Sequence, residues 1–346
     1  MMQEDAGVSI AQGGWLAAAN YLGYLVGAVW AMVQRARSDQ AIRLALAITS
    51  LATVAMGLTE GIAAWLVLRA LAGIASAWVL IHMSSWCALR LARLERPGLN
   101  GVVFAGVGTG VVLAGMLCLG LMSVDASSRS AWISLGVLGL AMTAAVWPVV
   151  ADSETAAATT SFGGYRWTAD TLRLVACYAA FGIGYIIPAT FVPVMAKQVI
   201  DDPAVFGWAW PVFGAAAAGS TLLAGAFERV LSGRRLWMTS ACGMALGVAS
   251  PLVIDGLMGI LACALLVGAT FVVATLAGVQ VAREVSGPAA HVLVAAMTAA
   301  FAASQVAGPL IVSLLAEHGG GIGGALLLAF GVLAASAAAL MVPLRR

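Results

Sequence analysis

Apolar runs about as long as a lipid bilayer is thick follow one another along the whole chain, separated by short polar or basic segments. A membrane-spanning helix needs about 20 largely apolar residues, within a range of about 17–25. Membrane strands would instead alternate apolar and polar positions over about ten residues, and runs such as "AMTAAVWPVV" do not alternate. We therefore expect an all-α, polytopic membrane protein with about eleven transmembrane helices, at about 10–33, 43–59, 62–88, 99–122, 131–150, 172–195, 208–227, 237–254, 257–281, 289–315 and 321–343.

The composition excludes a water-soluble globule. Of the 346 residues 62% are hydrophobic and only 9% are charged, whereas about a quarter of a soluble domain is charged. The partner that this composition demands is the lipid bilayer itself.

The basic residues give the predicted helices an orientation. Loops on the cytoplasmic side of a membrane protein are enriched in Lys and Arg. With the helices placed as above, two of the 17 Lys and Arg residues fall on one side, Arg129 and Lys197, and fourteen on the other: Arg35, Arg37, Arg43, Arg90, Arg93, Arg96, Arg166, Arg173, Arg229, Arg234, Arg235, Arg283, Arg345 and Arg346. We expect a multi-pass protein of the cell inner membrane, with its C-terminus in the cytoplasm and its N-terminus outside.

The longest polar stretch predicts a division into two bundles. It runs from 151 to 170, "ADSETAAATTSFGGYRWTAD", and is rich in the small and polar residues of a linker. It separates an N-terminal bundle, residues 1–150 with five helices, from a C-terminal bundle, residues 171–346 with six. The linker is expected on the cytoplasmic side.

One arginine lies in neither set of loops. Arg69 stands inside "LVLRALAGIASAW", where a charge at the bilayer centre costs about 2.5–3.5 kcal/mol on insertion scales. Helical spacing puts Trp65, Gly73 and Ser76 on its face. A charge in the membrane usually faces the interior of the bundle and marks a pathway, so Arg69 and Ser76 are candidates for substrate binding or coupling. The alternative is an arginine satisfied by backbone carbonyls that only fixes packing.

The acidic residues narrow the chemistry around Arg69. All 15 Asp and Glu residues fall in loops or at the ends of the predicted helices, so no carboxylate is expected deep in the membrane. That distribution favours a neutral or anionic solute over a cation. An unperturbed histidine has a pKa near neutral pH, which makes His82 and His291 candidates for titration, but both stand near cytoplasmic helix ends, where a structural role is more common.

Other polar residues inside the predicted helices are candidates for contact with a solute. Tyr178 and Tyr185 share a stripe of one helix, and a tyrosine offers both an apolar ring and a hydroxyl group to an organic molecule. Aromatic packing is the alternative for this pair. Gln305, Asn20 and Tyr24 complete the candidates.

Pairs of glycines four residues apart predict close helix packing rather than binding. They are Gly23 with Gly27 and Gly106 with Gly110, and we add Gly73 to this helix-packing set.

No motif for catalysis is present. We find no HExxH, no GxSxG, no P-loop and no dinucleotide fingerprint in the sequence. We expect no enzyme, no catalytic residue, no cofactor, no bound metal and no nucleic-acid partner.

Three local motifs and the arrangement around the linker resemble the major facilitator superfamily. "RALAG", from Arg69 to Gly73, resembles that superfamily's Arg-xxx-Gly motif. The run "GVVFAGVGTGVVLAG" at 101–115 resembles its glycine-rich motif, and "QRARSDQAIR" lies where the family has a charged signature. More closely, "SIAQGGWLAAANYLGYLVGA" and "FGIGYIIPATFVPVMA" resemble the YbfB/YjiJ-like branch over almost the whole chain.

The resemblance implies a secondary active transporter. Such a protein moves a small organic solute by alternating access between two helical halves, with a coupling ion, a proton being the candidate. The loop at 34–42 departs from the family because it lacks the Asp-Arg-x-Gly core. The opening "MMQEDAGVS" corresponds to the outer loop after the family's first helix, so that helix is expected to be missing. A non-transporting or truncated membrane protein of the same fold, a sensor or a remnant, is the alternative.

Overall fold

The computed structural model of the chain describes residues 2–33, 37–151, 165–199, 208–227, 232–317 and 321–343. Within these residues the chain is helical and contains no β-strand. A short helix α1 (Met2–Asp5) comes first, and two 3-10 turns lie at Pro97–Leu99 and Gly287–Ala289. The long helices of this part of the chain are α2 (Ile10–Val33), α3 (Ser38–Leu58), α4 (Ile62–Arg93), α5 (Asn100–Met122), α6 (Ser128–Ala151), α7 (Ala169–Val199), α9 (Ala209–Phe227), α10 (Gly233–Val253), α11 (Gly256–Ser286), α12 (Ala290–Glu317) and α13 (Gly321–Met341).

These helices confirm the predicted all-α, polytopic fold. Nine stretches of the described residues are long and apolar enough to cross a membrane. One of them, Gly256–Gly308, contains both α11 and part of α12, and α9 adds the shorter apolar segment Trp210–Ala224. Each predicted helix corresponds to one observed helix, and their ends differ by a few residues.

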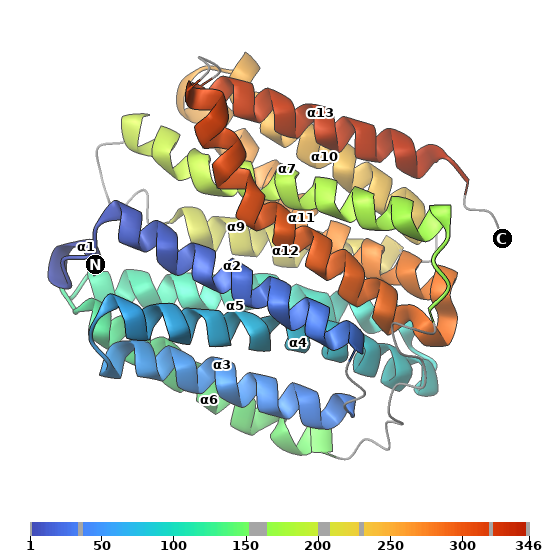
Figure 1. Cartoon of the computed structure of the whole chain (residues 1–346), viewed down its shortest axis with the longest axis horizontal. Coiled ribbons are helices and arrows are strands. Elements are labelled where there is room, and N and C mark those ends of the chain that lie inside the picture. Colours follow the sequence, from blue (N-terminus) through green and yellow to red (C-terminus); the bar gives the residue numbers. More distant parts are fainter. Residues whose placement is uncertain are drawn as a thin grey trace. The chain divides into compact units, whose positions relative to one another are not determined.

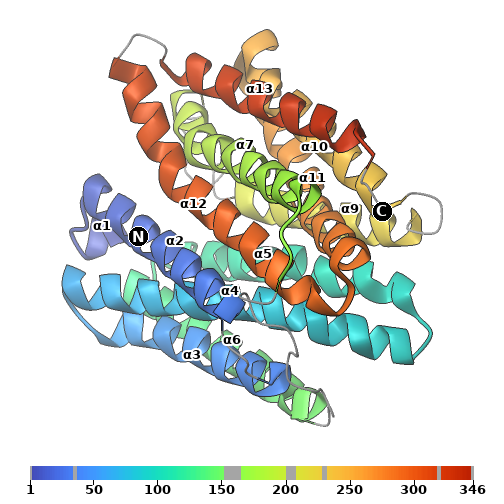
Figure 2. The same ribbon diagram turned by 45° about the vertical axis from the view of Figure 1, so that its right-hand side comes forward.

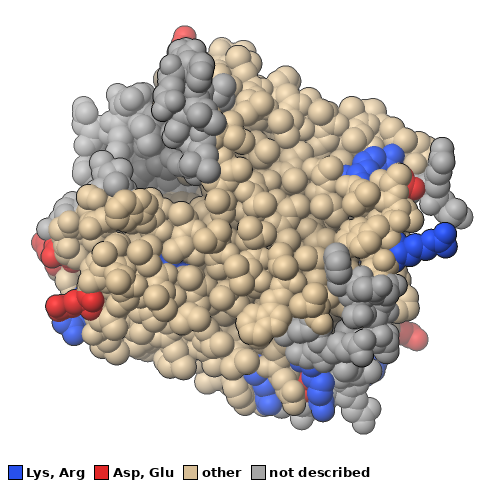
Figure 3. Space-filling view, in the orientation of Figure 1, with Lys and Arg blue, Asp and Glu red and all other residues tan. Residues whose placement is uncertain are grey.

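The surface of these helices suits lipid. Leu223 of α9, Leu246 of α10 and Val253 of α10 keep 63%, 63% and 79% of their surface exposed. In water such exposure would waste the favourable free energy of apolar burial, whereas in a bilayer it costs nothing. On the face that Figure 3 shows, uncharged residues dominate and most visible Lys, Arg, Asp and Glu atoms lie toward its edges.

Capping residues define several helix ends. Ser9 and Gln12 form a capping box at the start of α2, because the Ser9 amide donates to Gln12 Oε1 at 2.9 Å and the Gln12 amide donates to Ser9 Oγ at 3.1 Å. Ser232 accepts from the Arg235 amide at the start of α10. Gly287 ends α11 with φ +50°, a backbone conformation that a side chain disfavours.

The chain divides into two compact units. The first unit comprises residues 1–90, 116–166 and 288–303, and the second comprises residues 91–115, 167–287 and 304–346. Three of the described helices cross a unit boundary, since α4 changes unit after Arg90, α5 after Gly115 and α12 after Ala303.

In the first unit, α3 and α6 run along one another in both views (Figures 1 and 2). The hydroxyl groups of Ser50 and Thr143 meet at 3.3 Å between them. Arg43 donates to the Trp147 carbonyl at 3.1 Å and lies 4.7 Å from the centre of its ring. Paired polar groups of this kind hold helices together in lipid, where apolar burial gives no advantage.

In the second unit, α7, α10, α11 and α13 are neighbours. Arg173 of α7 donates to the Pro343 carbonyl at 3.4 Å, and Arg234 of α10 donates to the Val342 carbonyl at 3.1 Å. The carbonyls that follow a helix end lack partners within the helix, so these two arginines tie the end of α13 to α7 and α10.

Candidate functional site

Glycines bring α2 and α4 into close contact within the first unit. A Cβ atom added at Gly27 of α2 would lie 2.5 Å from the Ile74 carbonyl oxygen, and Gly23 meets the backbone of Ala70 one turn earlier. Gly73 of α4 faces α2 in return, and a Cβ there would lie 2.8 Å from the Tyr24 amide nitrogen. No side chain fits at these distances, so the glycine spacing sets how closely the two helices approach.

Arg69 is placed beside this contact by both of its neighbouring helices. The Asn20 side-chain amide of α2 donates to the Arg69 carbonyl oxygen at 3.0 Å. The Arg69 guanidinium carbon lies 5.8 Å from the centre of the Trp132 ring of α6, within the range of a cation–π interaction.

No carboxylate pairs with Arg69 among the described residues, where the two ion pairs are Arg37–Asp39 and Arg173–Asp170. Arg69 is partly exposed rather than sealed within protein. An aromatic face attracts a cation more weakly than a carboxylate does, and it does not neutralise the charge. The guanidinium group therefore keeps the capacity to bind an anionic group.

Of the remaining candidates of the first unit, Tyr24 belongs to the same interface, and Ser76 is bonded within its own helix. Ser76 donates to the Ala72 carbonyl of its own helix at 2.8 Å, so its proton is already engaged. Tyr24 lies one turn beyond Asn20, where its backbone faces Gly73. Asn20, Tyr24, Arg69 and Gly73 thus come together, although 49 residues separate Asn20 from Arg69.

A cluster of aromatic rings surrounds the two tyrosines of α7 in the second unit. Tyr178 is 3% exposed and meets Phe181 and Trp237 edge to face, with ring centres at 5.3 and 5.7 Å. Its hydroxyl group is hydrogen-bonded to Thr275. Two turns along, Tyr185 stacks on Phe271 with ring centres 4.2 Å apart.

This aromatic cluster is tightly packed, yet Tyr185 is only partly buried. Phe213 of α9 extends the cluster, at 6.5 Å from Tyr185 and 6.2 Å from Phe271. Sequence reasoning missed both phenylalanines because their helices lie far from Tyr185 in the chain. Tyr185 therefore keeps part of its surface exposed beside the Phe271 ring on which it stacks.

Gln305 stands on α12 and is 7% exposed. Its helix packs on α7 on both sides of this residue, because Ser304 donates to the Ala179 carbonyl at 2.9 Å and Gly308 abuts Ile186. Gln305 is therefore held beside the helix that carries Tyr178 and Tyr185.

The glycines of α5 contribute to packing at a register different from the one singled out in the sequence. A Cβ added at Gly106 or Gly110 meets no described atom within 4 Å. A Cβ at Gly108 would instead lie 2.5 Å from the Gly214 carbonyl oxygen of α9. The closest approach of α5 to α9 therefore runs through Gly108 and Gly214.

The structure also brings together two histidines that the sequence separates by more than 200 positions. His82 of α4 and His291 of α12 belong to the same unit and interact electrostatically. His82 is 9% exposed. Each residue alone gave no sign of this pairing.

The comparisons with known proteins agree with the fold. The family model described as "Uncharacterised MFS-type transporter YbfB" matches residues 1–341. The crystal structure of the human organic anion transporter MFSD10 (TETRAN) is similar, with a TM-score of 0.68 and 13% sequence identity over 95% of this chain and 82% of that one. A search of curated proteins found no match. The family match covers nearly the whole sequence, and we conclude that the chain belongs to the YbfB-type family of major facilitator superfamily transporters, a family of multi-pass membrane proteins that points to a transporter rather than an enzyme.

Proposed function

We propose that this protein is a secondary active transporter that moves a small organic solute across the inner membrane by alternating access. Its family and its fold support a membrane transporter acting on a small molecule. The two bundles, residues 1–150 and 171–346, are the halves that would alternate, and the segment 151–170 would link them in the cytoplasm. Most of that linker lies outside the described residues.

The observation that carries the proposal is the state of Arg69. Its guanidinium group lies within a membrane helix, against the Trp132 ring, and no carboxylate pairs with it in the described part of the chain. A charge in the membrane is costly and is retained where it serves a pathway. We assign Arg69 to binding a neutral or anionic solute, and Asn20 and Tyr24 to the same surface.

A transported anion would compensate the Arg69 charge only while it is bound. That difference between the loaded and the empty carrier is the kind of differential interaction that shifts a conformational equilibrium. One solved structure similar to this chain is that of an organic anion transporter, and its name is compatible with the same class of solute here. A proton remains the candidate coupling ion.

The second half would supply the apolar part of the binding surface. Tyr185 stacks on Phe271 and keeps part of its surface exposed, and Gln305 lies on the helix that packs against α7. We assign Tyr185 and Gln305 to solute contact. Tyr178 is buried and hydrogen-bonded, so we assign it to supporting the Tyr185 surface.

Counterflow in proteoliposomes tests the proposal. A panel of organic solutes matched in size but carrying a negative, zero or positive charge is presented to the wild type, to Arg69→Ala and to Arg69→Lys. Wild type should exchange a neutral or anionic member, Arg69→Ala should lose at least about tenfold in rate, which is about 1.4 kcal/mol, and Arg69→Lys should retain part of the activity.

Arg93→Ala is the matched control, since Arg93 is exposed at the other end of the same helix. Normal exchange by Arg69→Ala, or a preference for cations, would remove Arg69 from the mechanism. Absence of exchange with every solute would favour the non-transporting alternative.

A further inference from the structure

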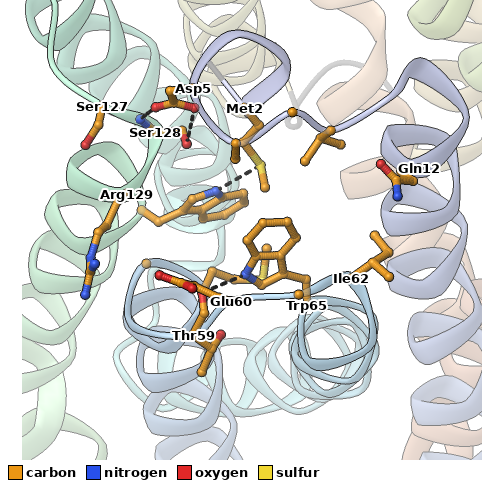
Figure 4. A pocket seen from close by; sticks show the side chains of 17 residues that line it. Met2, Asp5, Gln12, Thr59, Glu60, Ile62, Trp65, Ser127, Ser128 and Arg129 are labelled. Carbon is orange, nitrogen blue, oxygen red and sulfur yellow. Dashed lines mark hydrogen bonds between the residues drawn. The ribbon is translucent and has the colours of Figure 1, made fainter.

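A pocket of about 550 Å³ lies within the first unit, and Gln12 of α2 and Trp65 of α4 line it, ahead in sequence of the glycines at which these two helices meet. It is formed where α1, the turn between α3 and α4, and the start of α6 meet (Figure 4). Its volume falls within the range of about 300–1,000 Å³ that is usual for small-molecule sites. On the topology proposed above, it opens on the outer side of the membrane.

Two indole rings line this pocket, those of Trp65 and Trp132. Trp65 Nε1 donates to the Thr59 carbonyl at 3.1 Å, and Trp132 Nε1 donates to Met2 Sδ at 3.2 Å (Figure 4). Each ring is held by its own polar atom, and one face of the Trp132 ring lies toward the Arg69 guanidinium group. Rings fixed in advance bind at a lower entropic cost than mobile ones.

The short helix α1 closes one wall and is itself anchored. The Asp5 carboxylate accepts from both the amide and the hydroxyl group of Ser128 at the start of α6, the hydroxyl at 2.7 Å. Since α1 also supplies Met2, one segment fixes both the wall and the Trp132 ring.

The charged residues around the pocket are not its distinguishing feature. Asp5, Glu60 and Arg129 line it and all three are exposed. The Asp5 carboxylate accepts from Ser128, and Figure 4 shows the Arg129 side chain extending away from Trp65. The feature that distinguishes the lining is its pair of indole rings. Aromatic rings favour planar partners in offset or edge-to-face contact, by an amount beyond the buried area alone.

We propose that this pocket binds the planar aromatic group of a small organic molecule, as an outer binding site separate from Arg69. The proposal rests on the proposed function only in assuming that the protein handles organic solutes. Because Trp132 lines the pocket and its ring also lies 5.8 Å from the Arg69 guanidinium carbon, a bound molecule would touch the ring that contacts Arg69.

Ligand-observed ¹⁹F NMR on the full chain in detergent provides the test, with 4-fluorobenzamide as the probe. Unlabelled benzamide and cyclohexanecarboxamide then compete with it. The two are matched in size and neither is charged, but only benzamide is planar. The probe signal should broaden, and benzamide should displace it at a concentration about tenfold lower than cyclohexanecarboxamide does.

Two variants locate the site. Trp65→Leu should abolish the competable broadening, whereas Trp15→Leu, whose ring is 57% exposed on α2 and lies outside the pocket, should leave it unchanged. Ala6→Trp keeps both rings and fills the pocket from its rim, so it should abolish binding as well and covers the case in which Trp65→Leu does not fold.

Equal displacement by the two competitors, absence of broadening, or full binding by folded Trp65→Leu or Ala6→Trp would overturn the proposal. Binding is measured without transport. If benzamide binds but no solute exchanges in proteoliposomes, the proposed function fails and the pocket stands. If solutes exchange but benzamide does not bind, the pocket alone fails.

Discussion

The contact of α2 with α4 and the aromatic cluster on α7 achieve close packing in opposite ways. At the first, the side chains are absent: Gly23, Gly27 and Gly73 let two backbones meet, and the polar groups of Asn20 and Arg69 lie beside them. At the second, large rings fill the space, as Tyr185 does on Phe271. Helices in lipid gain nothing from burying apolar surface against one another, so each region relies on contact distance or on ring geometry.

The two regions differ in the substitutions that they can tolerate. A backbone contact has no flexible atom that can move aside, whereas a ring can rotate or be replaced by a smaller apolar group. We therefore expect the first region to fail by overcrowding and the second by loss of contact.

The largest expected effect is that of Gly73→Ala. The added Cβ would lie 2.8 Å from the Tyr24 amide nitrogen, and overpacking of this kind costs about 3 kcal/mol. The melting temperature in detergent should fall sharply, and the folded fraction on size exclusion should fall with it.

Gly106→Ala is the matched control for that change. Its Cβ meets no described atom within 4 Å, so replacing a glycine within a helix should raise stability by up to about 1 kcal/mol. Equal losses in both variants would show that contact with Tyr24 does not set the spacing of α2 and α4.

The helices and the glycine contact show which parts of the fold could be predicted from the sequence. Apolar runs predicted every long helix because the length of a span is set by the bilayer. Local spacing placed Gly73 and Arg69 on one helix, and Gly23 with Gly27 on another. That these two helices are each other's partners could not be predicted, because spacing within a helix carries no information about its neighbour.

Trp132 and Phe271 show the same limit at the sites. Each contacts a candidate residue from a distant part of the chain, Trp132 at Arg69 and Phe271 at Tyr185. In a membrane helix an aromatic residue facing lipid and one facing a partner look alike in sequence, since both environments are apolar. The prediction of which α5 glycines pack against another helix was wrong for a related reason. Several glycines lie close together in α5, and only the path of α9 distinguishes Gly108 from Gly106.

Phe271→Ala should have the next largest effect. It removes the ring that stacks on Tyr185 and neighbours Phe181 at 5.7 Å. Truncating a fully buried phenylalanine costs about 3–5 kcal/mol of stability. Because this ring is only partly buried, we expect a loss of about 2 kcal/mol, measured as a fall in melting temperature. Phe330→Ala, on the exposed face of α13, should change stability little. If the two variants lose equally, the cluster contributes no more than general apolar bulk.

Tyr178→Phe should have a smaller effect, because it keeps the ring contacts with Phe181 and Trp237 and removes only the hydroxyl group bonded to Thr275. A hydrogen bond of this kind contributes about 1 kcal/mol. In the double variant with Thr275→Val, the second change should add little. Fully additive losses in this cycle would contradict the hydrogen bond.

Asp5→Asn should have the smallest effect, and it tests by pH the anchor of α1 on α6, which belongs to neither of the two regions. Burial tends to raise the pKa of Asp5, but the hydrogen bonds from Ser128 outweigh it and lower the pKa below the usual 3.8. A carboxyl group whose pKa is lower in the folded state stabilises the fold above its unfolded pKa, and this stability is lost as the pH falls through the folded pKa. The wild type should therefore have a slightly higher melting temperature than Asp5→Asn near about pH 7, and this difference should disappear toward about pH 3.

Asp125→Asn, in the loop between α5 and α6, is the control, and its melting temperature should show no such convergence with the wild type. A gap for Asp5→Asn that persists at low pH would mean that the charge of Asp5 does not hold α1 against α6, and that the outer wall of the pocket depends on Met2 and the apolar contacts of α1 instead.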